Sequence, residues 1–539
     1  MQNLLFQPLV TPEESARWDK LAESDYHVPT LLLMENASRA ALYCLKEAYG
    51  PKDLLGPGLR VLVLSGGGNN GGDGLALARQ LANRDCQVEV RTLRSPDQYS
   101  GISREHMEMA RLAGVNVKQL DSASFCRDAA DDAPDIIDYV PDIIIDALFG
   151  AGFRGPLRDD GLAAVRLINQ FAARGAFVLS LDIPSGLSAL SGRPEPEAVR
   201  ANLTVSFAAA KPGLCLPWAE AYTGQLRVAE IGLPLELIRH TKSRFRLICP
   251  RPGILPKLPP QIHKAEKGKV LIIGGSPGLT GAATLSALGA CRAGAGLVTV
   301  AAPAGLSGEI KSGHPEIMTR PLGRFSGESA HDWDEAMLAD LFECIAGLGK
   351  KSAIVLGPGL GRSQAAAAIV ESVLRLPDRP PLVLDADALF PYIVEHLRPD
   401  DVLTPHAGEM LRLLGEKPGM NFGKLLELPE RSEAARLFCA HCPAVLLLKG
   451  AGTLIGRGDE ALALNPFAEP NLAVGGSGDV LSGLIAALLA RGLDSLSAAS
   501  LGAWIHARSG SLLRRRWPAG GNLASDIALL LPEALAELY

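Results

Sequence analysis

A short glycine-rich segment near the carboxyl end of the chain carries an aspartate. Residues 475–479 read Gly-Gly-Ser-Gly-Asp and precede an apolar run with helical spacing, which predicts that a helix begins here. Successive glycine N–H groups and the positive end of a helix dipole bind phosphate. A carboxylate beside a phosphate is repelled unless it takes a proton from a substrate hydroxyl, so we interpret Asp479 as a general base. Without the glycines around it, an aspartate in a first turn is more often a helix cap. The apolar side chains expected on one stripe of this helix are Val480, Leu481, Leu484, Ile485, Leu488 and Leu489.

Other polar and glycine-rich clusters follow apolar runs in the same half of the chain. Lys449 begins a candidate phosphate or nucleotide loop, and His406 stands three residues before Glu409. Each of them also has a simpler interpretation. His406 can be a loop histidine, Glu409 a carboxylate at a helix start, and Lys449 a lysine that ends a strand at solvent. The clusters are Gly357–Gly361, Asp385 with Asp387, His406 with Glu409, and Lys449–Thr453.

The first half of the chain has two glycine-rich turns and two aspartates at the ends of apolar runs. The turn at 66–74 opens a helix and matches the phosphate-binding pattern GxGxxG, a weak signal taken alone. Asp146 precedes the second turn, while Asp182 and Ser185 end another apolar run. Oxygen groups from separate strand ends can converge on a hard cation, whereas each one alone is as easily a helix cap.

These clusters need strands to position them, and the apolar pattern supplies candidates. Short runs rich in Val, Ile and Leu alternate with helical segments, which indicates an α/β fold with parallel sheets covered on both faces. Right-handed crossovers then bring the carboxyl ends of the strands to one ligand-facing edge. The expected strands lie in 60–65, 87–93, 142–150, 176–186, 269–275, 296–303, 353–359, 381–388 and 444–450, and a proline-rich segment near 245–260 divides them into two blocks.

Length and composition narrow the class of protein. With 539 residues the chain exceeds one ordinary core, so we expect two domains, 1–245 and 255–539. The net charge of −6 argues against nucleic acid, and no signal peptide or membrane span is evident, so we expect a cytoplasmic protein. Nine cysteines show no disulfide pattern, and the pair Cys439 and Cys442 lacks the second pair of a zinc site, so we expect reduced thiols.

The first block resembles a known family. The segments LLMENAS (32–38), GGGNNGGDG (66–74), DALFGAGFRGP (146–156), DIPSGL (182–187) and AAAKPGL (208–214) resemble, in order, the N-terminal domain of NAD(P)H-hydrate epimerases. The resemblance implies a Rossmann-like α/β/α sandwich and a K⁺ ion bound by Asn70, Asp146 and Ser185. Ser188 departs from the family pattern, which commonly has aspartate there. Asp182 is our candidate acid/base by position. The implied contacts to hydrated nucleotide are Asn69, Asn70, Gly71, Gly72, Asp73, Gly150, Ala151, Gly152, Phe153, Arg154, Gly155, Pro156 and Asp182.

The second block resembles another family. The segments VLIIGGSPGLTGAA (270–283), GPGLG (357–361), LDADAL (384–389), LTPHAGEM (403–410), KGAGT (449–453) and GGSGDVLSG (475–483) are similar to the ADP- or ATP-dependent NAD(P)H-hydrate dehydratases. These belong to the ribokinase-like superfamily, so a ribokinase-like α/β/α sandwich and Mg²⁺ with ADP or ATP are implied. Implied contacts to the AMP moiety are Lys449, Gly450, Ala451, Gly452, Thr453 and Gly478, and those to the hydrated nicotinamide are Ala282, Gly359, His406 and Asp479.

Together the two resemblances imply a bifunctional enzyme of metabolite repair. The N-terminal domain is expected to interconvert the R and S hydrates of NADH and NADPH, and the C-terminal domain to dehydrate the S epimer with ADP or ATP. We expect a homo-oligomer whose other partners are small molecules, with no nucleic acid and no membrane. Two alternatives remain open: a ribokinase-like kinase for a vitamin precursor alcohol, and a first block that only binds nucleotide or RNA.

Overall fold

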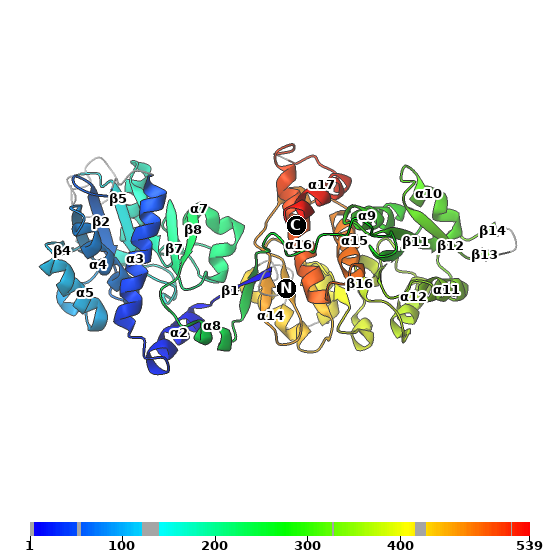
Figure 1. The fold of residues 1–539 in the computed structure, drawn as a ribbon, viewed down its shortest axis with the longest axis horizontal. Coiled ribbons are helices and arrows are strands. Elements are labelled where there is room, and N and C mark those ends of the chain that lie inside the picture. The colour runs from blue at the N-terminus through cyan, green and yellow to red at the C-terminus, as the bar shows by residue number, and fades with distance from the viewer. Residues whose placement is uncertain (1–4, 51–54, 121–138, 326–327, 416–426, 519) are drawn as a thin grey trace. The chain divides into compact units, whose positions relative to one another are not determined.

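The chain folds into two compact units. The computed structural model describes residues 5–50, 55–120, 139–325, 328–415, 427–518 and 520–539, drawn as solid ribbon in Figure 1. One unit is Pro8–Phe245, and the other joins Arg246–Tyr539 to the residues up to Gln7. Strands β1 (Phe6–Leu9) and β9 (Phe245–Ile248) lie at one edge of the second unit's sheet. The first part of the expected proline-rich linker therefore belongs to a strand, which the sequence pattern did not indicate.

The first unit has a seven-stranded parallel sheet of order β4-β3-β2-β5-β6-β7-β8. The four strands expected in this block form as β2 (Arg60–Ser65), β3 (Gln87–Thr92), β5 (Ile143–Ala147) and β6 (Phe177–Leu181). Three further strands were not predicted from the sequence: β4 (Asn116–Gln119), β7 (Leu203–Phe207) and β8 (Gln225–Ala229). Both edge strands, β4 and β8, are mostly exposed, so they lack the continuous apolar run of a central strand.

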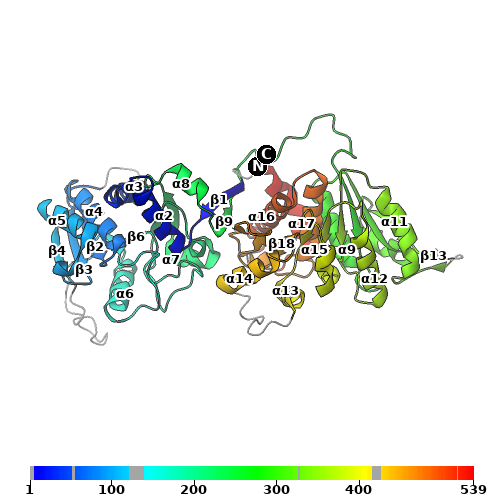
Figure 2. The same ribbon diagram turned by 90° about the horizontal axis from the view of Figure 1, so that it is seen from below.

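Helices cover both faces of this sheet. Val61 and Val63 of β2 pack with one set of helices, whereas Leu62 and Leu64 pack with α6 on the other face. In Figure 2, α3 and α6 lie on opposite sides of the strands. The helices are α2 (Pro12–Ser24), α3 (Thr30–Tyr49), α4 (Asn69–Ala82), α5 (Gly101–Leu112), α6 (Asp159–Ala173), α7 (Glu220–Thr223) and α8 (Leu235–His240).

The second unit contains an eleven-stranded sheet of order β1-β9-β20-β19-β18-β17-β16-β15-β10-β11-β12. The expected strands form as β10 (Lys269–Ile273), β11 (Leu297–Pro303), β15 (Ser352–Leu356), β16 (Leu382–Leu384) and β18 (Val445–Leu448), all parallel, with β12 (Met318–Leu322) and β17 (Val402–Leu403) joining them. The parallel arrangement ends at β19 (Leu454–Gly456) and β20 (Leu462–Leu464), which pair antiparallel. The two-domain α/β fold is confirmed, with a mixed sheet in the second unit.

The helices of the second unit complete its layers. In the described chain, no helix is long and apolar enough to cross a membrane. The helices are α9 (Thr280–Arg292), α10 (Ser307–Lys311), α11 (Leu338–Ala346), α12 (Gln364–Arg375), α13 (Ala407–Leu414), α14 (Leu428–Cys439), α15 (Ser477–Ala490), α16 (Ser495–Leu513) and α17 (Ala524–Ala536).

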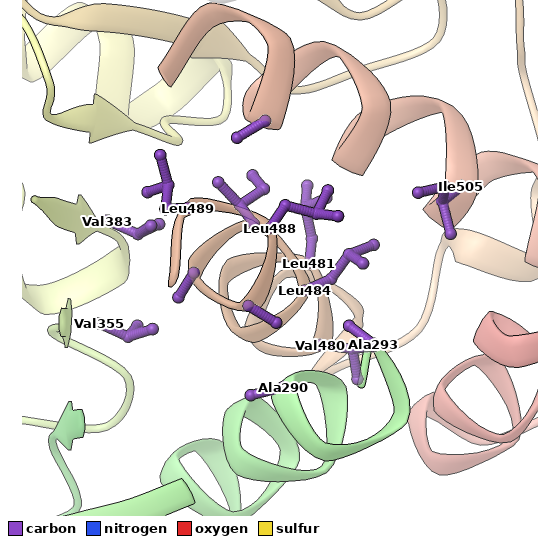
Figure 3. Packing of buried hydrophobic residues seen from close by; sticks show 14 of the residues in the cluster. Ala290, Ala293, Val355, Val383, Val480, Leu481, Leu484, Leu488, Leu489 and Ile505 are labelled. Atoms are coloured by element: carbon purple, nitrogen blue, oxygen red, sulfur yellow. The ribbon is translucent and has the colours of Figure 1, made fainter. Parts of the chain in front are cut away.

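Helix α15 lies at the centre of the second unit's core. All six side chains expected on its apolar stripe are buried, but Ser482, Gly483 and the alanines on its other sides are buried as well. Figure 3 shows its leucines between Val355 and Val383 of the sheet, Ala290 of α9 and Ile505 of α16. The helix is therefore enclosed on all sides, and the single stripe predicted from sequence was too narrow.

Helices α9 and α15 approach each other closely because both carry glycine at the contact. A Cβ on Gly483 would lie 1.8 Å from the Ser286 carbonyl oxygen, and one on Gly289 would lie 2.3 Å from the Val480 oxygen. Because real Cβ atoms never come so close, neither position accepts a side chain without a backbone shift.

Gly483→Ala is therefore expected to destabilise the second unit by about 1–3 kcal/mol, the usual cost of overpacking a core. The measurement is the free energy of unfolding by denaturant. Gly308→Ala is the control, because a Cβ there meets no atom within 4 Å and the change leaves the core untouched. Equal stability of the two variants would contradict the tight α9–α15 contact.

Candidate active sites

The glycine turns of the first unit pack against each other. Strand β2 ends at Ser65, and α4 begins at Asn69. A Cβ on Gly66 would lie 1.8 Å from the carbonyl oxygen of Leu148, which follows β5. The missing side chain thus lets the two turns meet at the carboxyl edge of the sheet, where a doubly wound sheet binds ligands.

A cavity of about 630 Å³ opens at this edge. Gly71 and Gly72 lie buried beneath it, within α4. Arg154 and Gly155 line neighbouring hollows, and Arg154 forms an exposed ion pair with Glu13. Pro156 lines one of those hollows. The predicted contact residues that line the cavity itself are Asn69, Asn70, Asp73, Gly150, Ala151, Gly152, Phe153 and Asp182.

A buried ion pair lies at the cavity wall. Asp182 follows β6 with a positive φ of 63°, and its Oδ2 accepts a hydrogen bond of 2.9 Å from the Ala151 N–H. Its Oδ1 contacts Nζ of Lys211, which also donates to Ser206 Oγ at 3.1 Å and to the Phe207 carbonyl at 3.3 Å. The Lys211 side chain is 1% exposed. The sequence analysis missed this lysine, although its position in an apolar segment after β7 was a usable signal.

Two further carboxyl groups share the cavity. Burial raises the pKa of Asp73 well above its usual range, and the charges of Asp182 and Asp19 raise it further, while Lys211 opposes them. Burial and Asp182 raise the pKa of Asp19 to about 6. Asp19 comes from α2 and was not predicted from sequence. The cavity therefore combines protonatable carboxyl groups with an aspartate whose charge a lysine balances, an arrangement suited to moving protons.

The three residues that the resemblance implies for K⁺ come from β5, from the turn after β6 and from the first turn of α4, and K⁺ binding stays a prediction. Asp146 is fully buried and accepts hydrogen bonds from Ser185 Oγ at 2.6 Å, Ser185 N at 2.8 Å and Ser180 Oγ at 2.8 Å. Burial raises the pKa of Asp146, and these hydrogen bonds oppose that effect. Asn70 keeps both amide atoms buried without a hydrogen-bond partner. An unpartnered amide oxygen, a carboxylate and a hydroxyl fit a hard cation.

In the second unit, the glycine-rich segment forms the start of α15 as expected. Gly476 caps the helix with a φ of 88°, and Ser477 is its first residue. His506 of α16 places Nε2 at 3.0 Å from the Ser477 carbonyl oxygen and 3.2 Å from its Oγ. Burial lowers the pKa of His506 to about 4, so its imidazole is neutral. This histidine holds the helix start in place.

A lysine and several carboxylates surround that helix start. Lys449, at the end of β18, places Nζ at 2.8 Å from Asp385 Oδ1 and 3.8 Å from Glu409 Oε2. Burial lowers the pKa of Lys449, but the neighbouring carboxylates outweigh burial and raise it overall. A Cβ on Gly478 would lie 3.3 Å from this Nζ. The lysine therefore lies in a cluster of carboxylates and does not simply end its strand at solvent, and its role in nucleotide binding stays a prediction.

Asp479 stands beside this cluster. Its pKa is raised to about 7, first by burial and then by the charge of Asp385; Lys449 lowers it, and Asp387 and Glu409 add smaller upward effects. A carboxylate with a pKa near neutral can both exist in its basic form and hold a proton once it has accepted one. The electrostatics thus support the role of general base, which stays a prediction.

The remaining predicted residues lie on neighbouring turns. His406 caps α13: its Nδ1 accepts from Gly408 N at 3.0 Å, and Glu409 Oε2 accepts from His406 N at 2.8 Å. The simple capping role thus holds for both residues, and Nε2 of the half-exposed imidazole lies 3.4 Å from Glu409 Oε1. Gly359 adjoins Ala282, because a Cβ there would lie 3.1 Å from that of Ala282.

The loop Lys449–Thr453 is closed on itself. Thr453 Oγ1 donates to the Gly450 carbonyl at 2.8 Å and accepts from Gly450 N at 3.3 Å. Elsewhere in this unit, burial raises the thiol pKa of Cys439 to about 12 and that of Cys442 to about 11, so both stay protonated. In the part of the chain that the structure describes, no cluster of three or more His, Cys, Asp or Glu side chains is arranged to hold a metal ion.

Comparisons with known proteins cover both units. A family model described as NAD(P)H-hydrate dehydratase matches residues 270–532, and one described as YjeF-related protein N-terminus matches residues 30–213. A crystal structure of an ADP/ATP-dependent NAD(P)H-hydrate dehydratase from Bacillus subtilis, co-crystallized with ATP/Mg²⁺, is 28% identical with a TM-score of 0.43, covering 53% of this chain and 95% of that one.

Whole-length relatives extend the match. The bifunctional NAD(P)H-hydrate repair enzyme Nnr of Moorella thermoacetica is 37% identical over 538 residues, which cover 98% of this chain and 97% of the relative. The protein of the same name from Dictyoglomus turgidum is 34% identical, covering 98% of each chain. The chain belongs to the family of bifunctional NAD(P)H-hydrate repair enzymes.

Proposed function

We propose that this chain repairs hydrated NADH and NADPH in two steps. The first unit interconverts the R and S hydrates, and the second dehydrates the S epimer with ADP or ATP, releasing AMP or ADP and phosphate. The observation that carries the proposal is Asp479 at the amino end of α15, with a pKa near neutral, beside Lys449. We infer that the substrate hydroxyl and the transferred phosphoryl group meet at this helix start.

The chemistry of the second unit follows from a poor leaving group. Hydroxide leaves carbon slowly, whereas phosphate leaves readily. We propose that Asp479 takes the proton of the hydroxyl on C6 while that oxygen receives the terminal phosphoryl group of the nucleotide. Electrons of the ring nitrogen then expel phosphate, and loss of a proton from C5 restores the dihydropyridine. Lys449 and the N–H groups at the start of α15 stabilise the transferring charge.

Mg²⁺ bound with the nucleotide would neutralise phosphate charge in this site. The carboxylates of Asp385 and Glu409, which flank Lys449, are hard oxygen donors of the kind that Mg²⁺ accepts. The loop Lys449–Thr453 and Gly478 are the proposed contacts to the AMP moiety. Ala282, Gly359 and His406 are the proposed contacts to the hydrated nicotinamide.

The first unit supplies the epimer that the second can use. Epimerisation requires loss of the C6 hydroxyl as water, driven by the ring nitrogen, and return of water to the other face. Asp182 is the proposed acid/base, and Asp73 and Asp19 are nearby carboxyl groups able to hold protons. K⁺ held by Asn70, Asp146 and Ser185 would supply positive charge at this end of the cavity.

The proposed function is tested with a mixture of both hydrate epimers. With ADP or ATP present, the absorbance of the reduced dinucleotide is expected to return fully, with release of inorganic phosphate. Recovery limited to the S fraction would leave only the second activity, and no recovery would refute the repair function. A stable phosphorylated product would instead indicate a kinase.

Asp479→Asn is expected to reduce dehydration by a factor of about 10² or more, because a general base is removed. Interconversion of the epimers should continue, since the proposed epimerase residues lie in the other unit. Asp494→Asn is the matched control: it makes the same change at the cap of α16, where asparagine also caps well. Loss of both activities in a folded Asp479→Asn protein would contradict the division of labour.

The rate of dehydration is expected to rise with pH. A general base works in its deprotonated form, so kcat/KM should increase as pH passes through about 7, where Asp479 loses its proton. Asp385 raises this pKa, so Asp385→Asn should move the rising limb to lower pH. A pH profile without such a limb, or one displaced upward in this variant, would argue against Asp479 as the base.

Lys211→Met is expected to leave the Asp182 carboxylate, which is 16% exposed, without its ion-pair partner, at a cost to the first unit of about 3 kcal/mol, the lower end of the range for a buried pair. Epimerisation should fall while dehydration of the S epimer persists. Adding Asp182→Asn removes the unpaired charge and should recover stability without recovering epimerisation. Denaturant unfolding measures the stability, and epimer assays measure the activity. Recovery of epimerisation in the double variant would exclude Asp182 as the acid/base.

A further inference from the structure

Helix α14 directs a buried arginine at the loop that follows β18. Nη1 of Arg431 donates to the carbonyl oxygens of Ala451 at 2.7 Å and Gly452 at 3.1 Å. Its Nη2 donates to those of Leu448 at 3.1 Å and Lys449 at 3.5 Å. The residue is only 3% exposed. One guanidinium thus ties together the backbone on both sides of Gly450.

The positive charge of Arg431 is balanced by backbone carbonyl groups and not by a carboxylate of the described residues. Burial lowers its pKa to about 10, which still leaves the guanidinium protonated at neutral pH. Among the described residues, no carboxylate forms an ion pair with it. Arg379 of the same unit is equally enclosed but makes two hydrogen bonds of 2.7 Å to the carboxylate of Asp401. Burying a charged guanidinium against carbonyl groups alone costs free energy. Its hydrogen bonds to those carbonyl groups hold the loop in one conformation.

Gly450 and Arg431 constrain each other. Gly450 has a φ of 150°, and a Cβ on it would lie 3.0 Å from Nη2 of Arg431. A side chain at this position would therefore press against the guanidinium. The loop conformation, and with it the backbone that carries Lys449 toward Asp385, depends on both residues.

We propose that Arg431 is a positioning residue for the nucleotide site: it holds the loop from Leu448 to Gly452 in its binding conformation before ADP or ATP arrives. A loop that is already ordered loses less conformational freedom when it binds a ligand. This inference rests on the proposed nucleotide-dependent dehydration. It adds a residue that lies beneath the loop, outside its glycine-rich motif.

The test compares Arg431→Met with Arg431→Lys. The methionine fills similar space without donors, so the KM for ADP or ATP is expected to rise about tenfold or more, a loss of roughly 1.4 kcal/mol in binding, with a smaller fall in kcat. The lysine keeps the charge and part of the hydrogen bonding, so its KM should lie between those of Arg431→Met and the wild type. The KM for the hydrate should change little in both.

Two controls separate positioning from general stability. Glu433→Gln changes an exposed side chain of the same helix and should leave the nucleotide KM unaltered. Arg379→Lys weakens the buried ion pair with Asp401, so it should lower thermal stability without raising the KM for the nucleotide. A wild-type nucleotide KM in Arg431→Met, or equal effects in the two arginine variants, would overturn the inference.

Measuring nucleotide binding in the absence of the hydrate tests the role of Arg431 separately from the dehydration activity. Calorimetric titration with ADP or ATP should show weakened binding in Arg431→Met and wild-type binding in Glu433→Gln, even if the wild type fails to dehydrate. If Arg431→Met does not fold, Gly450→Ala perturbs the same contact from the loop side and should weaken binding likewise. Unchanged binding in Gly450→Ala and Arg431→Lys would then refute the inference.

Discussion

Both units depend on keeping carboxylates buried beside a lysine. In the first unit Lys211 contacts Asp182, and in the second Lys449 contacts Asp385. Such lysines offset part of the cost of burying negative charge, and the carboxyl groups left over respond by holding protons more tightly. Asp73 and Asp479 are those groups, with pKa values raised by burial and by their acidic neighbours. The same constraint therefore leaves carboxyl groups with raised pKa values in each unit, Asp19 and Asp73 in the first and Asp479 in the second.

The fold delivers these groups through strand ends and helix starts. In each unit, parallel strands bring their carboxyl ends to one edge of the sheet. Asp182 stands there in the first unit, and Asp385 and Lys449 stand there in the second. The position of Asp479 depends further on α15, which is enclosed by the sheet, α9 and α16. Glycines at 289 and 483 let that helix approach α9, and His506 fixes its first turn. Packing within the core thus sets where Asp479 lies.

Much of this arrangement could be predicted from the sequence, because buried strands and glycine turns leave local patterns. Central strands such as β2 and β10 are continuous apolar runs, whereas the exposed edge strands β4 and β8 are not. The short antiparallel β19 and β20 carry no signal of direction.

The candidate site residues also fall into two groups, those that lie in a local sequence pattern and those that do not. Residues inside glycine-rich motifs, such as Asp479 and Asn70, could be predicted as candidates because their neighbours form a recognisable pattern. Asp19, Lys211 and Arg431 were not predicted, because each contacts groups on other elements that come beside it only when the chain folds. The substrate contacts proposed for His406 and Gly359 rest on resemblance, and their geometry shows a helix cap and a close turn.

The central claim is that the C6 oxygen of the hydrate is phosphorylated before it leaves, with Asp479 as the base. The most direct measurement labels that oxygen with the heavy isotope and follows it through a single turnover with ADP or ATP. Phosphoryl transfer to the hydroxyl predicts that the label appears in inorganic phosphate, in step with formation of the reduced dinucleotide. Label released into water, with unlabelled phosphate, would contradict the account.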